Sequence, residues 1–299
     1  MSAPSRAGST PPAQSRPLVA PPSTPMRSVL ATLCTATASA FSPFGKFLPD
    51  GFGFRRMSGF PANAVGVSDV LASPQWPADW PYAPRDFQRA DDLPDQIFYD
   101  APRFCFHVDD KAVEALTAHY ATAFKAWDKP AILDICASHV SHFPADIADY
   151  AGKRVALGMN EEELARNEQV DEYVVKDLNA EPVLPFEDDS FDIVTNVVSI
   201  DYLTQPLAIC KEVARVLKPG GQAMFALSNR CFPSKAVDIW LRTNDLEHVF
   251  VVGSYYHYSG AFQKPFAVEV SPNQATTPWS GGRSQNIAYL AVVKATVDK

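Results

Sequence analysis

The sequence predicts an α/β domain with a parallel sheet, and three observations support this prediction. From about Asp100 onward, short apolar runs alternate with helical or turn-rich segments, which is the order of βαβ units. Stretch 112–124 has the spacing of a helix that buries one face. The 299 residues, 46% hydrophobic and 20% charged, are enough for one large soluble domain with an extension.

The elements follow in chain order. Val113, Leu116, Tyr120 and Phe124 share one face of the first predicted helix, Ala112 to Phe124. Apolar runs then predict five strands, each followed by helical or turn-rich sequence, and this pattern is typical of a parallel sheet. These strands are Ala131–Cys136, Arg154–Gly158, Tyr173–Lys176, Asp192–Val198 and Ala223–Leu227.

The stretch from Leu184 to Gly221 is the most specific part of the chain. It contains a turn, a buried strand, a loop and a helix whose first turn includes Pro206, where the missing N–H costs nothing. Pro219-Gly220-Gly221 is predicted to end that helix. The apolar stripe of the helix consists of Cys210, Val213, Ala214 and Leu217.

The same stretch resembles the small-molecule, ubiquinone- and menaquinone-type (type 11) branch of class I S-adenosylmethionine-dependent methyltransferases. The resemblance rests on Leu184-Pro185-Phe186 followed by acids, on Ser190-Phe191-Asp192, and on the ending Arg215 to Gly221. An unrelated α/β protein that shares one strand–helix unit is the alternative. The resemblance implies S-adenosyl-L-methionine as cofactor and a small molecule as methyl acceptor.

The resemblance also implies a Rossmann-like, seven-stranded sheet flanked by helices and ending in an antiparallel hairpin. Phe266–Val270 and Ile287–Lys294 would be the last two strands, joined by the Pro-, Gly- and Ser-rich segment 271–286. A dinucleotide-binding dehydrogenase is the nearest other enzyme. It would need Gly-x-Gly-x-x-Gly after its first strand, and Cys136 to Ser141 contains no glycine.

Loop 136–140 is where the family cradles the methionine part of the cofactor, and here the sequence departs from the family pattern. Asp134 is retained, but Cys136, Ser138 and Val140 stand where three glycines are usual. Cys136 and Ser138 are small enough to line a modified loop, and Val140 is the most awkward replacement. The missing glycines favour a second hypothesis, a catalytically silent domain that serves as a binding or assembly module.

Four further residues complete the predicted cofactor site. Asn160 ends the second strand where the family has an acid for the ribose hydroxyls, and its carbonyl can accept hydrogen bonds as well; Glu161 to Glu163 are alternatives. Asp177 and Leu178 stand where the family binds adenine, although Asp177 could instead cap a turn. Asn196, within the Leu184–Asn196 motif, is the last predicted cofactor residue.

No metal site and no catalytic base are predicted. His139 and His142 lack a third ligand nearby, and methyl transfer needs no metal. A base is needed only where the acceptor carries a proton to be removed. The resemblance places a set of aromatic residues on the acceptor side, although aromatic residues there are more often packing: Tyr202, Trp240, Tyr255, Tyr256, His257 and Tyr258.

Charge and composition exclude several classes of function. A formal net charge of −8 without a run of Lys or Arg argues against a nucleic-acid surface. No stretch approaches the ~18 consecutive apolar residues of a membrane-spanning helix. The five cysteines lie far apart, which indicates reduced thiols rather than zinc or disulfide motifs. The oligomeric state has no signal in the sequence.

The chain is predicted to have three parts, 1–40, 41–100 and 101–299. The first 49 residues contain no Asp or Glu, and the run that ends in Ala38-Ser39-Ala40-Phe41 resembles a plastid cleavage site. We therefore expect a disordered presequence over 1–40 and a chloroplast (stromal) location, with mitochondrion, cytosol or a plain disordered tail as alternatives. Residues 41–100, with eight prolines, predict an irregular arm packed on the methyltransferase-like domain over 101–299.

Overall fold

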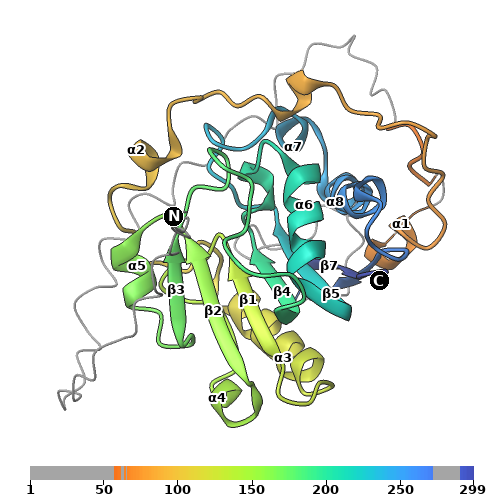
Figure 1. The fold of residues 1–299 in the computed structure, drawn as a ribbon. Helices are drawn as coiled ribbons and strands as arrows, with labels where there is room; N and C mark the ends of the chain where they lie inside the picture. Colours follow the sequence, from red (N-terminus) through yellow and green to blue (C-terminus); the bar gives the residue numbers. More distant parts are fainter. Residues whose placement is uncertain (1–56, 62–63, 65, 272–289) are drawn as a thin grey trace, which may run out of the picture. The chain divides into compact units, whose positions relative to one another are not determined.

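The structure is a computed structural model that describes residues 57–61, 64, 66–271 and 290–299. Within these residues a seven-stranded sheet has the order β3-β2-β1-β4-β5-β7-β6 (Figure 1). Strands β1 to β5 are parallel, and β7 lies antiparallel between β5 and β6. The strands are β1 (Ala131–Ile135), β2 (Lys153–Gly158), β3 (Glu172–Val175), β4 (Phe191–Val197), β5 (Leu217–Ser228), β6 (Phe266–Glu269) and β7 (Leu290–Thr296).

The predicted fold class is confirmed, including the reversed hairpin at the end of the sheet. β6 matches the predicted Phe266–Val270, and β7 overlaps the predicted Ile287–Lys294 from Leu290 onward. Segment 272–289, which covers nearly all of the predicted connection and the start of the last predicted strand, lies outside the described residues. The chain order reverses between β1 and β4, and at such a switch point the loops on either side diverge and leave room for a ligand.

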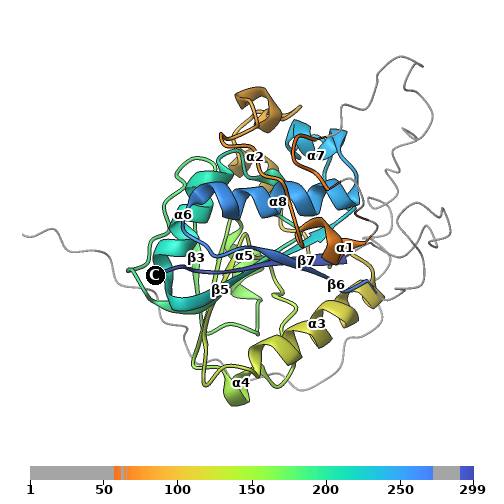
Figure 2. The same cartoon turned by 90° about the vertical axis from the view of Figure 1, so that its right-hand side faces the viewer.

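Helices cover both faces of the sheet (Figure 2). On one face, α6 and α8 pack with α1 and α7 over Leu133, Val194 and Phe225. On the other face, α3 packs over Ile132 and Ile193. The helices are α1 (Val67–Val70), α2 (Asp95–Tyr99), α3 (Asp110–Phe124), α4 (Ile147–Tyr150), α5 (Glu161–Ala165), α6 (Pro206–Val216), α7 (Asp238–Arg242) and α8 (Asp245–Ser259), with the 3-10 helices η3 (Pro84–Phe87) and η4 (Ile200–Tyr202).

The described part of the predicted irregular arm contains short helices and joins the core. Val67, Val70 and Leu71 are buried with α8 in the larger hydrophobic cluster. The prediction that this arm holds no regular helix was wrong for α1, η3 and α2, which are short enough to fit between the prolines. From η3 to α2 the chain passes α7 and reaches the side of the sheet where α5 lies (Figure 1).

Four cysteines lie in the described residues, and none of them forms a disulfide there: Cys105, Cys136, Cys210 and Cys231. Cys34 and the predicted presequence lie outside the described residues. In the part of the chain that the structure describes, we find no helix with the length and apolar character to cross a bilayer.

Candidate functional site

The loop after β1 keeps a compact turn without the expected glycines. Cys136 has φ +57°, in the left-handed region that favours glycine. The next residue, Ala137, donates its backbone N–H to the Leu157 carbonyl at 2.8 Å. A Cβ on Gly158 would lie 2.1 Å from the Ala137 carbonyl oxygen. The loop therefore crosses directly over the end of β2, and Gly158 permits this approach.

Strained backbone is concentrated at the carboxyl edge, which we define as the side of the sheet where β1 to β4 end. Among the described non-glycine residues, six have positive φ, and four of these lie in loops at this edge: His107, Cys136, His142 and Val198. Val198 is β-branched, so its φ of +44° is unusual. Such strain is most often found at functional sites.

Asp134 supports the loop from below rather than facing the edge. Its side chain is 2% exposed and accepts a hydrogen bond from Thr195 Oγ1 at 2.8 Å. Ser141, at the far end of the loop, also lies in hydrogen-bond reach. Burial raises the pKa of the Asp134 carboxyl to about 7, and the two hydroxyls oppose this only in part. Asp134 therefore acts on the predicted site through the loop.

Ser138 and Glu163 tie the loop to the N-terminal segment. Ser138 Oγ donates to Glu163 Oε2 at 2.6 Å, and Arg103 donates its backbone N–H to Glu163 Oε1 at 2.6 Å. Glu163 is buried, with 7% exposure. The sequence offered Glu161 to Glu163 as a group, and only the structure shows that Glu163 faces the loop.

Asn160 is the N-cap of α5. Its Oδ1 accepts from the Glu163 backbone N–H at 3.0 Å, and its Nδ2 donates to the Tyr99 and Asp100 carbonyls at 2.8 and 3.0 Å. Since an amide oxygen has two lone pairs, Oδ1 can still accept one more hydrogen bond. The residue predicted for the ribose thus lies at the edge and also holds the N-terminal segment there.

Asp177 caps the turn after β3, the alternative role that the sequence left open. Its Oδ1 accepts from the backbone N–H groups of Asn179 and Ala180 at 2.8 and 3.1 Å, whereas Oδ2 takes no part in this turn. Leu178 is 4% exposed and belongs to the larger hydrophobic cluster. The two residues lie at the carboxyl edge, and their predicted contact with adenine stays a prediction.

Two buried side-chain oxygen atoms, one near the end of β4 and one in the loop that follows it, have no hydrogen-bond partner in the described residues: Asn196 Oδ1 and Asp201 Oδ2. Asn196 is fully buried and donates Nδ2 to the Ile135 carbonyl at 3.2 Å, so its oxygen points away from that bond. Asp201, 3% exposed, was not predicted. Its burial raises the pKa of the carboxyl above the ordinary value, and the charge of Asp201 is felt at Cys136 and Tyr99.

The predicted acceptor-side aromatics separate into core and edge. Tyr255 and Tyr256 on α8 are buried core residues, Trp240 stacks on His248 with centroids 3.8 Å apart, and His257 stacks on Trp76. Only Tyr202 lies at the edge, where its hydroxyl accepts from the Phe232 backbone N–H at 2.9 Å. Tyr255, Tyr256 and Trp240 therefore have the packing role that the sequence left open, whereas His257 is exposed. A contact of these residues with a methyl acceptor stays a prediction.

The two histidines of the first loop pack on an aromatic ring. His139 stacks parallel to Phe106 at 6.1 Å, and His142 meets the same ring edge-on at 5.8 Å. The described residues contain no group of three or more His, Cys, Asp or Glu side chains arranged to hold a metal ion.

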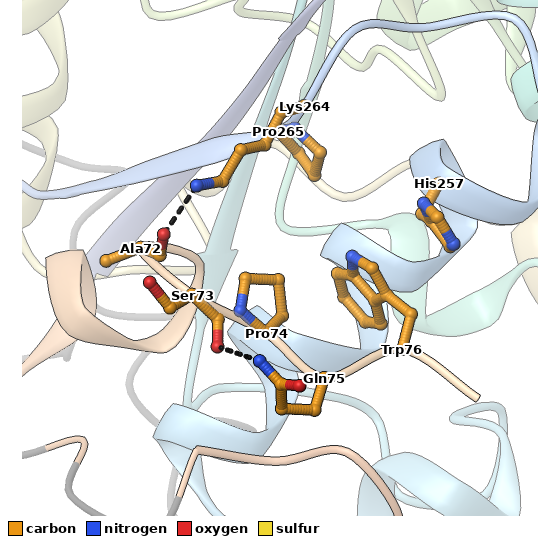
Figure 3. Close-up of a pocket in the computed structure, with 8 residues that line it drawn as sticks. All are labelled: Ala72, Ser73, Pro74, Gln75, Trp76, His257, Lys264 and Pro265. Carbon is orange, nitrogen blue, oxygen red and sulfur yellow. Dashed lines mark hydrogen bonds between the residues drawn. The ribbon is translucent and has the colours of Figure 1, made fainter.

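One cavity, of about 480 Å³, lies apart from the predicted site residues. Lys264 Nζ reaches across its rim to the Ala72 carbonyl, and Trp76 lies beside His257 (Figure 3). Both faces of the Trp76 ring are covered, by Phe250 and His257. The lining comprises Ala72, Ser73, Pro74, Gln75, Trp76, His257, Lys264 and Pro265.

Comparisons with known proteins show methyltransferases that are similar to part of this chain. Residues 136–225 match the family model described as a methyltransferase domain. A sterol 4-C-methyltransferase of Caenorhabditis elegans is 30% identical over 128 residues, which cover 40% of this chain and 38% of that protein. A ubiquinone biosynthesis O-methyltransferase of Parvibaculum lavamentivorans is 26% identical over 122 residues, 37% of this chain and 48% of that protein.

The chain thus spans less than half the length of these curated relatives. Among solved structures, a putative S-adenosylmethionine-dependent methyltransferase from Listeria monocytogenes is 16% identical, with a TM-score of 0.44 over 62% of this chain and 100% of that one. The family match, with the sheet order, supports a class I methyltransferase domain and S-adenosylmethionine as its cofactor.

Proposed function

We propose that this protein transfers a methyl group from S-adenosylmethionine to a small-molecule acceptor at the carboxyl edge. The observation that carries the proposal is the pair of buried acceptors without a partner, Asn196 Oδ1 and Asp201 Oδ2, beside the loop after β1. S-adenosylmethionine carries an ammonium group, hydroxyl donors and a sulfonium charge, which such acceptors and a buried carboxylate suit.

The residues present fit this cofactor. Cys136 and Ser138 are small and half-buried, the second oxygen of Asp177 is outside its turn, and Asn160 Oδ1 has a free lone pair. When bound, the cofactor supplies an already activated methyl group. The protein's own part is to orient donor and acceptor and to exclude water.

The small-molecule acceptor rests on the resemblance and on the similarity of part of the chain to relatives named for small-molecule methylation. Tyr99, Tyr202 and Phe232 give the edge an apolar, aromatic lining beside Asp201. If the acceptor carries a proton to be removed, the buried Asp201 carboxyl can take it in its ionised form, since burial raises its pKa and so its strength as a base.

Transfer of radioactive label tests the proposal. The full chain is incubated with methyl-tritiated S-adenosylmethionine and either a small-molecule extract or a protein extract. We expect label in the small-molecule fraction, and less of it with the Asp201→Asn variant. The control variant Asp171→Asn should transfer as much label as the wild type, because Asp171 pairs with Arg154 and directly precedes β3, at the end of the strand opposite the carboxyl edge. Label in the protein fraction would refute the small-molecule acceptor, and no transfer to either fraction would favour the silent binding module.

We also propose import into a plastid, on the acid-free composition of residues 1–49 and the Ala38–Phe41 sequence. These residues lie outside those that the structure describes. A fluorescent fusion should enter the plastid and should be diverted by Phe41→Ala. A cytosolic fusion that keeps its first 40 residues by mass spectrometry would contradict this.

A further inference from the structure

The segment before α3 is fastened across the carboxyl edge. We call residues 84–107 the strap. Its backbone pairs with the chain after β5: Arg89 forms a β-bridge with Val237, Asp238 donates its N–H to the Gln88 carbonyl at 2.8 Å, and Asp91 donates to the Ser234 carbonyl at 2.8 Å. The strap therefore has a fixed register against the loop after β5.

Asp95 is the centre of a buried polar network in the strap. Arg89 Nη1 donates to both of its oxygens at 2.8 Å, and Lys235 Nζ lies 3.1 Å from Oδ1. Asp95 is 5% exposed and Lys235 is fully buried. Burial alone would raise the pKa of the Asp95 carboxyl, but hydrogen bonds from Arg89, Asn179 and Lys235 hold it below the ordinary value. The carboxylate is thus present as the charged form.

The third donor to Asp95 comes from the predicted adenine loop. Asn179 Nδ2 donates to Asp95 Oδ2 at 2.7 Å and to the Tyr202 carbonyl at 2.9 Å. Asn179 Oδ1 accepts two hydrogen bonds from Thr204, one from its backbone N–H at 2.8 Å and one from its hydroxyl at 3.1 Å. Donors and acceptors on all sides fix the orientation of this amide, which joins the loops after β3 and β4 to the strap.

Asn179 also fixes Asp177. The Asn179 backbone N–H is one of the two donors to Asp177 Oδ1, so a shift of Asn179 moves the turn that contains Asp177 and Leu178. A change of ~1 Å in a binding group is enough to cost a large factor in function. The path runs from Asp95 through the Asn179 side chain to the Asp177 turn.

We infer that Asp95 is a positioning residue for the cofactor site, one that sets the adenine end through Asn179. The inference rests on the proposed function. It makes the strap, which lies outside the segment that matches the methyltransferase family model, a required part of the cofactor site. Arg89 and Lys235 keep Asp95 charged and in place, and the bond to Asn179 transmits its position.

Calorimetry with two ligands tests the inference on the full chain. S-adenosylhomocysteine has both the adenosine and the amino-acid part, whereas 5′-methylthioadenosine has only the adenosine part. We expect Asp95→Asn and Asn179→Ala each to weaken both ligands by a similar factor, roughly tenfold. The control is Asp91→Asn, which lies 3.3 Å from Lys235 in the same network but makes no bond to Asn179. It should change both affinities less than twofold.

The binding results separate a failure of the positioning role of Asp95 from a failure of the proposed methyltransferase function. If the wild type binds S-adenosylhomocysteine and both Asp95→Asn and Asn179→Ala bind both ligands as tightly as Asp91→Asn, the positioning role is overturned. A loss confined to S-adenosylhomocysteine also overturns it, because the adenosine part would be unaffected. If Asp95→Asn does not fold, Asn179→Ala decides, since it leaves the Arg89–Asp95–Lys235 ion pairs intact. A wild type that binds neither ligand refutes the proposed function itself.

Discussion

Cys136 has a left-handed backbone conformation, which costs an L-residue about 1–2 kcal/mol. The family's glycine would avoid that cost, and the loop nevertheless keeps the glycine-type φ of +57°. Val140, expected from the sequence to be the most awkward replacement, is absent from the described non-glycine residues with positive φ. The strain therefore lies at Cys136, next to the end of β1, and not at Val140.

The glycine and alanine variants at Cys136 and at Val140 should therefore rank in opposite order of stability. At Cys136 we expect the glycine variant to be at least as stable as the alanine variant, by up to about 1 kcal/mol, because alanine keeps the left-handed strain. At Val140, glycine should be less stable than alanine by about 0.5–1 kcal/mol. Urea unfolding of the four variants measures this, and the same order at both positions would contradict it.

Asp134 predicts how stability depends on pH. Its pKa of about 7 lies above the value of an unfolded carboxyl, so the folded protein keeps a proton that the unfolded chain has lost. The stabilising contribution is complete below about pH 4 and is lost as the pH rises to about 7. Asp134→Asn does not titrate and should lack this loss, which amounts to ~1.4 kcal/mol for each unit of pKa shift. If the free energies of unfolding of wild type and variant change in parallel between pH 4.5 and 7.5, a raised pKa of Asp134 is ruled out.

At the scale of elements, the end of β2 and the loop after β1 are one structural unit. Gly158 pairs with Val175 of β3 and lies under Ala137, whose carbonyl leaves no room for a Cβ. The glycine at this strand end is needed for close packing of backbone on backbone.

Gly158→Ala should accordingly cost about 1–3 kcal/mol of stability, since backbone must move to admit the methyl group. Gly66→Ala is a matched control, because the nearest atom to its added Cβ is 3.7 Å away. Thermal unfolding compares the two variants. Equal, small losses would show that the loop after β1 yields more easily than its contacts indicate.

The predicted strands coincide with short apolar runs, which are visible in the local sequence. For β5 only the apolar part, Ala223–Leu227, was predicted. The helix α6 ends at Val216 and β5 already begins at Leu217, so Pro219-Gly220-Gly221 lies inside a strand segment and not at the helix stop. Helix α8 was not predicted, since it is buried nearly all round and lacks a polar face. Its capping box of Asn244 and Glu247 was the available signal.

At the scale of the molecule, the carboxyl edge combines the matched segment with the strap. The motif residues Asn160, Asp177 and Asn196 could be placed there because strand ends meet at one edge of a parallel sheet. Asp95 and Arg103 could not, because their partners Asn179 and Glu163 lie 84 and 60 residues away and no periodicity links them. Long-range polar contacts of this kind have no local sequence pattern.

Binding of S-adenosylhomocysteine to the full chain tests the central claim most directly, that this edge is a cofactor site. Isothermal titration calorimetry at neutral pH should show saturable binding of one ligand per chain, weakened in Asp177→Ala and unchanged in Asp171→Ala, whose carboxylate pairs with Arg154. Binding that Asp177→Ala leaves intact would place the ligand elsewhere. The absence of any heat and of any thermal shift at millimolar ligand would contradict the account.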